Sequence, residues 1–310
     1  MLSKTYIIIV TYNAMPWLDK CLGSIDFKRY KVVIVDNNSS DGTVSHIISN
    51  YEEVKLFQEN SNLGFGQGNN KGISYALQQG AEHVFLLNQD AYLIGDCLEQ
   101  LINVQEKSPN YGILSPVHTN ASITRLDRNF SNYVQFDRNP DFYSDHVLGN
   151  ELNDVYEVPF VNAAGWLISK ECLMTVGGFD PIFFHYGEDD NFCQRVRYHG
   201  FKIGVLSNVF MIHDREKRKK PKFEPFSEAY FKAKVKSFKV KNANINLDSE
   251  KASNLKKKYR RRIFKEWLEG NFLNSWQIQK EFEVLKVALL EVKDSRERNI
   301  NEGAHYLEIK

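Results

Sequence analysis

The sequence has few cysteines, no long apolar run and little net charge. The 4 cysteines, Cys21, Cys97, Cys172 and Cys193, form no CxxC pair and lack zinc-like spacing, so we expect reduced thiols. No apolar run approaches the roughly 18 residues needed to cross a bilayer. The first residues show no secretory pattern. We therefore expect a cytosolic protein without a membrane-spanning helix.

The net charge of +1 conceals an uneven distribution along the chain. Residues 1–213 carry 15 Lys and Arg against 24 Asp and Glu, whereas residues 214–310 carry 25 against 15. This asymmetry indicates two regions with different partners. With 42% hydrophobic and 25% charged residues, the composition is that of an ordinary globular protein.

The first half alternates short β-branched runs with helical patterns. This predicts βαβ units and a parallel sheet covered by helices on both faces. We expect strands at residues 6–10, 32–35, 54–57 and 83–87, and helices from about 16, at 41–50 and at 68–79. Residues 120–157 are expected to form a long loop or insertion. Ordered structure is expected again over 158–169, followed by a helix near 170, and helical periodicity dominates after residue 213.

Two aspartates directly follow apolar strand-like runs. Asp36 either contacts an edge nitrogen of a pyrimidine base or caps a helix. For Asp41, helix capping is favoured. Asp90 either binds a hard divalent cation that bridges the phosphates of a nucleotide or ends its strand as a solvated turn residue. In a sheet of this type both would lie at the strand ends, where ligands bind.

The segment 62–72 is rich in glycine and leads into a predicted helix. Glycines let a backbone approach a ligand, and free N–H groups at a helix start favour phosphate. The spacing is not that of the dinucleotide fingerprint. A tight connection without a ligand is the alternative.

Three adjacent acids, Glu188, Asp189 and Asp190, follow an aromatic segment. A sheltered carboxylate here could accept a proton from a sugar hydroxyl, or the acids could simply complement a helix N-terminus. His213 ends another apolar run and is either a metal ligand or structural. Its metal role depends on whether it converges with Asp90.

Seven segments taken in order resemble family-two glycosyltransferases of the GT-A fold, and most closely the bacterial rhamnosyltransferase-like branch. They are VTYN at 10–13, VDNNSSDGT at 35–43, NLGFGQGNN at 62–70, LLNQD at 86–90, NAAG at 162–165, GGFD at 177–180 and GEDDNFCQR at 187–195. The resemblance implies a GT-A α/β domain with a mixed sheet over residues 1–215 and a basic, mainly helical C-terminal region over 216–310.

The resemblance also implies an inverting transfer from a UDP- or dTDP-sugar to a saccharide acceptor in cell-surface polysaccharide synthesis, and we expect this acceptor to be lipid-linked. It places the site residues as follows: Thr11, Tyr12 and Asp36 at the base, Asn62, Gly64 and Asn88 along the nucleotide, Asp90 and His213 at a Mn²⁺ or Mg²⁺ ion, Asp189 as general base, and Glu188 and Arg195 positioning acceptor, base or diphosphate.

Two positions depart from the family pattern. Asn88 replaces the usual first acid of the DxD motif, and Asn191 stands where relatives often have Asp, which leaves Asp189 and Asp190 as competing bases. Both departures motivate an alternative function, a non-catalytic sugar-nucleotide or glycan-binding protein on the same fold.

The C-terminal region contains two basic runs, 215–222 and 256–262. They could bind anionic lipid head groups and hold the enzyme peripherally at a membrane, or form a solvated helical face. Homodimerisation is a further possibility for this region. No nucleic-acid recognition motif is present, so nucleic acid ranks last.

Overall fold

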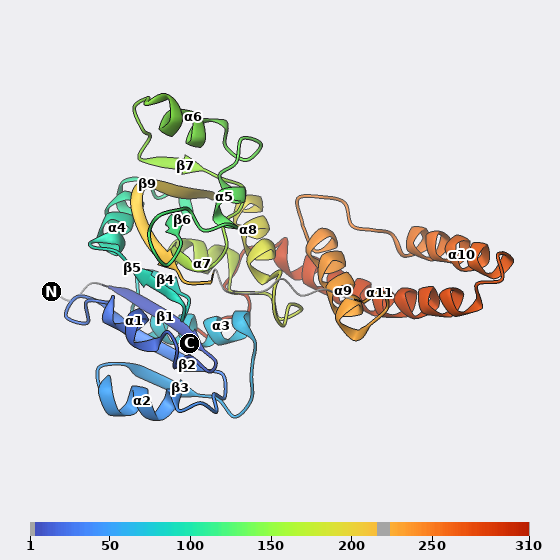
Figure 1. The fold of residues 1–310 in the computed structure, drawn as a ribbon, viewed down its shortest axis with the longest axis horizontal. Coiled ribbons are helices and arrows are strands. Elements are labelled where there is room, and N and C mark those ends of the chain that lie inside the picture. Colours follow the sequence, from blue (N-terminus) through green and yellow to red (C-terminus); the bar gives the residue numbers. More distant parts are fainter. Residues whose placement is uncertain (1–3, 216–223, 310) are drawn as a thin grey trace.

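A computed structural model describes residues 4–215 and 224–309 of the chain (Figure 1). Its centre is a mixed sheet with the strand order β3-β2-β1-β4-β8-β6-β9-β5, and β7 pairs with β9. The pairs β1–β2, β1–β4, β2–β3 and β6–β9 are parallel, whereas β4–β8, β6–β8, β5–β9 and β7–β9 are antiparallel. The strands are β1 (Thr5–Thr11), β2 (Lys31–Asp36), β3 (Lys55–Gln58), β4 (His83–Leu87), β5 (Ala91–Leu93), β6 (Tyr111–Thr119), β7 (Val155–Glu157), β8 (Gly165–Ser169) and β9 (Lys202–His213).

Helices cover both faces of this sheet because its central strands are apolar on both sides. In β1, Ile7 and Ile9 belong to one core cluster and Ile8 to the other, as the two-residue period of a strand requires. One cluster packs against α1 (Leu18–Gly23), α2 (Thr43–Asn50) and α4 (Cys97–Lys107). The other packs against α3 (Phe65–Gln78), α7 (Lys170–Val176) and α8 (Glu188–Tyr198).

Residues 120–157, predicted as a long loop or insertion, contain short elements of their own. These are α5 (Phe130–Tyr133), α6 (Pro140–Leu148) and the edge strand β7. Asn139 caps α6 by accepting hydrogen bonds from the backbone N–H groups of Asp141 and Phe142 at 3.0 Å each. The segment therefore adds to the sheet edge as well as covering it.

The glycine-rich segment differs from its prediction as a loop. Helix α3 begins at Phe65, so most of the glycines lie within its first turns. A Cβ atom at Gly72 would collide with the side chain of Ile8, and one at Gly66 would collide with Phe179. These glycines therefore allow α3 to pack closely on the sheet. Only Gly64, the N-cap residue with φ of 82°, uses glycine's conformational freedom.

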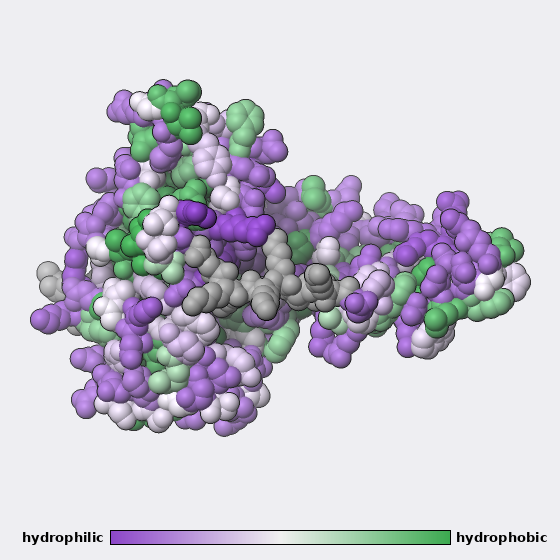
Figure 2. All heavy atoms as spheres, viewed as in Figure 1, coloured by the Kyte–Doolittle hydropathy of each residue, from purple (hydrophilic) through white to green (hydrophobic). Residues whose placement is uncertain are grey.

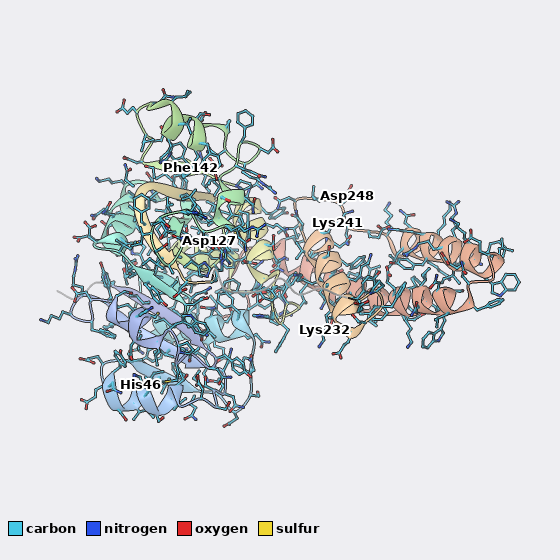
Figure 3. All side chains as sticks on the ribbon, viewed as in Figure 1. His46, Asp127, Phe142, Lys232, Lys241 and Asp248 are labelled. Carbon is cyan, nitrogen blue, oxygen red and sulfur yellow. The ribbon has the colours of Figure 1, made fainter. Side chains whose placement is uncertain are left out.

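Three helices follow the sheet: α9 (Glu228–Asn242), α10 (Ala252–Leu268) and α11 (Phe272–Asn299). Helices α10 and α11 form an antiparallel hairpin that projects from the rest of the molecule as an arm (Figure 1). Lys232 and Lys241 lie on α9 near the base of this arm, and Asp127 lies in the sheet region (Figure 3). None of the described helices combines the length and apolarity needed to cross a bilayer.

The chain then returns to the sheet region. The buried carboxylate of Asp180 accepts hydrogen bonds from Ser295 Oγ at 2.6 Å, Asn299 Nδ2 at 2.8 Å and Tyr306 Oη at 3.1 Å. Leu307 and Ile309 pack against the core cluster beneath α3 and α7. The GGFD motif thus anchors the end of α11 and the last residues.

Candidate active site

The carboxyl ends of β1, β2 and β4 lie at one edge of the sheet because these strands are parallel neighbours. Thr11 and Asp36 pair in register at this edge, and Thr11 Oγ1 donates a hydrogen bond of 2.8 Å to Asp36. The fully buried Asp36 carboxylate also accepts bonds from the N–H of Ser39 at 2.9 Å and its hydroxyl at 2.5 Å. A carboxylate has about four acceptor positions, so one remains for a ligand.

Tyr12 and the Asn88-Gln89 turn are linked across the same edge. The Tyr12 N–H donates to Gln89 Oε1 at 2.8 Å, and Gln89 Nε2 donates to the Tyr12 carbonyl at 3.2 Å. The Tyr12 side chain is half exposed. Asn88 Oδ1 is buried without a hydrogen-bond partner among the described residues, so it could accept a bond from a ribose hydroxyl. The loop after β1 and the turn after β4 therefore form one wall.

Asn62 and Gly64 border this wall from the start of α3. Asn62 Oδ1 accepts a bond of 2.8 Å from the Gly64 N–H, and the Gly64 carbonyl accepts one of 3.1 Å from Asn37 Nδ2. Asn37 directly follows Asp36. The glycine segment is thereby tied to the Asp36 strand end, and its backbone approaches the carbonyl of Phe184 just before the acidic cluster.

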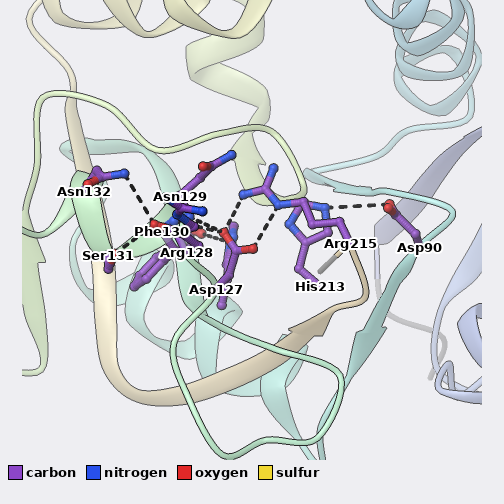
Figure 4. Close-up of polar contacts among 11 residues, drawn as sticks. Asp90, Asp127, Arg128, Asn129, Phe130, Ser131, Asn132, His213 and Arg215 are labelled. Carbon is purple, nitrogen blue, oxygen red and sulfur yellow. Dashed lines mark hydrogen bonds and ion pairs between the residues drawn. The ribbon is translucent and has the colours of Figure 1, made fainter. Parts of the chain in front are cut away.

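Asp90 and His213 converge at the same edge, as a shared metal role requires. Ala91 of β5 pairs with His213 of β9, which brings the preceding Asp90 beside the imidazole. His213 Nε2 lies 3.7 Å from Asp90 Oδ1, and both side chains are buried (Figure 4). Neither ring nitrogen of His213 has a hydrogen-bond partner among the described residues. An imidazole nitrogen of this kind beside a carboxylate oxygen suits a divalent cation.

These two residues form an incomplete protein site for such a cation. No group of three or more His, Cys, Asp or Glu side chains within 4–215 and 224–309 is arranged to hold a metal. Further ligands would have to come from a bound molecule or water, as is usual for cations that bridge phosphates. The donor set therefore fits an ion that binds together with a nucleotide diphosphate.

His118 and the Asp127–Arg215 ion pair lie near His213, and Figure 4 shows the ion pair. The His118 and His213 rings meet edge to face at 5.9 Å, and burial, followed by the charge of His213, holds the pKa of His118 well below its ordinary value. Arg215 Nε donates to Asp127 Oδ2 at 2.9 Å, and its Nη2 binds the other oxygen. Burial opposes ionisation of Asp127, but the Arg215 guanidinium lowers its pKa overall. The pair fixes the chain directly after His213.

The acidic cluster opens α8, whose N-cap is Gly187. Burial, then the charges of Glu188 and Asp190, raise the pKa of Asp189 to about 7. Burial also raises the pKa of Glu188, whose Oε2 has no hydrogen-bond partner among the described residues. The pKa of Asp190 is likewise raised by burial, and the positive charges of Lys236 and Arg138 partly offset this rise. A carboxylate with a pKa near neutrality is suited to accept a proton at physiological pH.

Tyr133 connects this cluster with the Asp90–His213 side. Burial raises the pKa of Tyr133 to about 12, and both the Arg215 guanidinium and the Asp189 charge act on it. Its hydroxyl also interacts with Arg215. The sequence did not single out Tyr133, Asp127 or His118. The first two lie in the polar, Asn- and Asp-rich segment 120–157, and His118 lies inside β6 without a motif around it.

Arg195 is not brought into this site. Its buried guanidinium donates to the carbonyls of Val176 at 2.8 Å and Gly178 at 2.6 Å, and its Nε donates to Asn191 Oδ1 at 2.9 Å. All three acceptors are internal to the fold. Arg195 and Asn191 thus hold α8 against the GGFD turn, and the expected contact with acceptor or diphosphate finds no support here.

A cavity of about 1120 Å³ lies beside the segment that precedes α8. Its walls are mainly apolar and come from residues 182–186, α9 and α11, with Phe183, Phe226, Phe231 and Val235 among them. Four lysines and two acids also border it: Lys232, Lys236, Lys239, Lys280, Glu228 and Glu283. A ligand with an apolar body and an anionic group would match this lining.

Comparison with known proteins identifies a family for the fold and site. The sequence profile described as "Glycosyl transferase family 2" matches residues 6–173. The chain is 26% identical over 215 residues to dTDP-rhamnosyl transferase RfbF of Shigella flexneri, covering 69% of this chain and 70% of that protein. It is 24% identical over 238 residues to N-acetylglucosaminyl-diphospho-decaprenol L-rhamnosyltransferase of Mycobacterium tuberculosis, covering 67% and 75%.

Solved structures confirm the GT-A fold. Mannosyltransferase PcManGT from Pyrobaculum calidifontis, in complex with GDP-Man and Mn²⁺, is 18% identical with a TM-score of 0.55, over 95% of this chain and 74% of that one. S. aureus TarS in complex with UDP-GlcNAc is 15% identical with a TM-score of 0.53, over 97% and 89%. The mixed sheet with C-terminal helices is thus shared well beyond the matched profile.

Proposed function

The chain belongs to glycosyl transferase family 2 and is a glycosyltransferase acting on nucleotide sugars, and from this premise we propose its donor, acceptor and stereochemistry. The donor is a dTDP- or UDP-sugar, with a deoxyhexose such as rhamnose favoured by the names of the relatives. The acceptor is a lipid-linked saccharide, and the transfer inverts the anomeric carbon.

The convergence of Asp90 and His213 carries this proposal. Separated by 123 positions in sequence, they meet at the sheet edge that also holds Asp36. We assign Thr11, Tyr12 and Asp36 to the base, Asn62, Gly64 and Asn88 to the ribose and nearby phosphate, and Asp90 and His213 to the cation. A bound Mn²⁺ or Mg²⁺ would neutralise charge on the departing diphosphate, and the complex of PcManGT with GDP-Man and Mn²⁺ is consistent with this.

Asp189 serves as the general base in this account. The acceptor oxygen forms its bond to the anomeric carbon while the bond from that carbon to the diphosphate oxygen breaks. The hydroxyl proton passes to Asp189, and the nucleoside diphosphate leaves with the electron pair. Burial, and after it the charges of Glu188 and Asp190, keep the Asp189 pKa near neutrality, which makes Asp189 a stronger base than an exposed aspartate.

The acceptor's lipid part fits the cavity beside α8. Its apolar walls suit a polyprenyl chain, and Lys236 borders it where it could meet an attached diphosphate, whereas Lys232 pairs with Glu228 at 2.6 Å. The mycobacterial relative is named for a diphospho-decaprenol acceptor. This location would bring the saccharide end towards Asp189, since residues 182–186 lead directly into α8.

The non-catalytic alternative receives no support from Asn191. Its side chain holds Arg195 inside the fold, so its amide has a structural task rather than replacing a lost catalytic acid. Asn88 remains able to bind a ribose hydroxyl without contributing to the metal.

Calorimetric titration with dTDP-rhamnose, other dTDP-sugars and UDP-sugars, each with and without Mn²⁺, tests the proposal. We expect binding of at least one donor to strengthen with Mn²⁺, and Asp90→Ala and His213→Ala each to abolish the Mn²⁺ effect. Asp96→Ala, at an exposed helix cap, is the control. Binding of no donor, or an undiminished Mn²⁺ effect in both variants, would refute it.

A further inference from the structure

The α10–α11 arm ends in a set of large apolar side chains that the arm does not need for its own packing. The two helices are held together by buried Leu255, Tyr259, Ile278 and Leu285. Around the turn between them lie six exposed residues, which we call the apolar tip: Phe264, Trp267, Leu268, Phe272, Leu273 and Trp276. Their exposed fractions range from 54% for Trp276 to 67% for Leu273.

The apolar tip lies at the far end of the arm. Figure 2 shows hydrophobic residues gathered at the far end of the arm, with hydrophilic residues along the arm itself. The Phe264 and Trp267 rings are stacked with centroids 6.3 Å apart, so the side chains already associate with one another. Exposed apolar patches of this kind mark sites that bind a protein or a membrane.

Helix α10 adds a strong positive charge next to this tip. It carries seven basic residues and one acid, Glu266: the basic ones are Lys256, Lys257, Lys258, Arg260, Arg261, Arg262 and Lys265. Arg262 pairs with Glu281, and Lys265 pairs with Glu269. The other five are exposed and form no ion pair with another described residue. This part of the basic region lies on a folded helix, whereas residues 216–222 of the other run lie outside the described residues.

We propose that the arm docks on an anionic lipid bilayer, with the apolar tip inserted among the lipid head groups and the α10 cations on the phosphates. Trp, Phe and Leu beside Lys and Arg are the residues that interfacial helices use. A second copy of the chain fits less well, because a symmetric tip-to-tip contact would bring two cationic α10 helices together. A nucleic acid would neutralise the cations but leave the apolar tip in water.

Membrane docking would explain how the proposed enzyme reaches a lipid-linked acceptor. The apolar tip and the α10 cations support docking independently of the proposed reaction. An enzyme whose acceptor carries a lipid must reach the membrane surface, and a projecting arm would hold it there while the sheet region stays in water. Because vesicle binding is measured without donor or acceptor, its failure would leave the proposed transfer reaction untouched.

Flotation of the full-length protein with vesicles tests this inference. We expect the protein to float with phosphatidylcholine vesicles that contain phosphatidylglycerol and to stay behind with phosphatidylcholine alone. We expect a tip variant to partition at least tenfold less into the anionic vesicles. This variant combines Trp267→Ser, Leu268→Ser, Phe272→Ser and Leu273→Ser. A charge variant, Lys256→Gln with Lys257→Gln and Lys258→Gln, should bind more weakly and with less dependence on salt.

A matched control is available on α6. Val147→Ser with Leu148→Ser removes side chains that are 80% and 73% exposed but lie far from the arm in Figure 1, and it should float like the wild type. Lipids brominated near the head group should quench Trp fluorescence, and the quenching should fall when Trp267 and Trp276 are both changed to Phe. Trp17 and Trp166, which pack in the sheet region, provide the unquenched background.

Three outcomes would overturn the inference. The first is a tip variant that floats as well as the wild type, and the second is a wild type that does not float with anionic vesicles. The third is light scattering that shows a wild-type dimer and a tip-variant monomer with equal vesicle binding, which would make the tip an interface between copies. The tip variant should bind the donor as tightly as the wild type does. This control shows that the variant is folded.

Discussion

Burial, followed by the charges of Glu188 and Asp190, raises the pKa of Asp189 to about 7. A general base acts only when deprotonated, so kcat/KM should fall as pH decreases through about 7. Asp190→Asn removes one neighbouring negative charge and should move this acidic limb to lower pH without abolishing activity. Initial rates across pH with saturating Mn²⁺ measure both effects. An unchanged limb in Asp190→Asn would show that Asp190 does not act on the base.

The same raised pKa predicts a cost in stability. The folded chain retains the Asp189 proton at pH values where the unfolded chain has released it, so this group lowers stability progressively as pH rises from about 4 to about 7. Asp189→Asn should therefore raise the free energy of unfolding at pH 8 by about 1–3 kcal/mol. Urea unfolding at pH 8 and at pH 4 measures this. A difference between variant and wild type that is equal at both pH values would contradict the assigned cause.

Residues at strand ends were the most predictable part of the site. Asp36 and Asp90 follow buried strands, and parallel pairing brings such ends together. Arg195 could not be placed in this way, because a helix residue's direction depends on what packs against it. Its carbonyl acceptors, Val176 and Gly178, lie 17 to 19 positions earlier and carry no signal of that pairing.

Among the elements, strands and helices with a clear local period were foreseen. The predicted strand at 83–87 coincides with β4, and the helix predicted near 170 begins at Lys170. The antiparallel insertion of β8 between β4 and β6 was not deducible from βαβ alternation, since local patterns do not specify strand order. The glycine segment was misjudged as a loop because its glycines serve close helix packing instead.

At the junction of α11 with the sheet region, Asp180 accepts three side-chain hydrogen bonds from 295–306. Asp180→Ala would leave these buried donors unsatisfied and should cost about 2–4 kcal/mol of unfolding free energy. Amide hydrogen exchange over 295–306 should accelerate at the same time. Asp294→Ala, at an exposed position of α11, is the matched control and should change neither quantity. Wild-type exchange in Asp180→Ala would show that α11 is anchored by other contacts.

For the whole molecule, the last residues connect the helical arm back to the core of the sheet. Gly178 donates to the His305 carbonyl at 2.7 Å, Glu308 N–H donates to Ser74 Oγ at 3.0 Å, and Leu307 packs on the core. Deleting residues 303–310 should lower Tm by about 5–10 °C. Leu290→Ser, at an exposed site on α11, should leave Tm within error of the wild type. An unchanged Tm after the deletion would mean that the tail contributes little to stability.

Transfer itself is the most direct test of the central claim that Asp189 activates an acceptor for attack on a nucleotide sugar. The measurement follows a labelled sugar from dTDP-rhamnose, or from the donor that binds best, to lipid-linked N-acetylglucosamine or a lipid extract. We expect the wild type to form glycolipid and free nucleoside diphosphate in equal amounts. Asp189→Asn should bind the donor normally yet transfer about 10²–10⁴-fold more slowly, whereas Asp190→Asn should remain active. Transfer by Asp189→Asn at the wild-type rate would contradict the account.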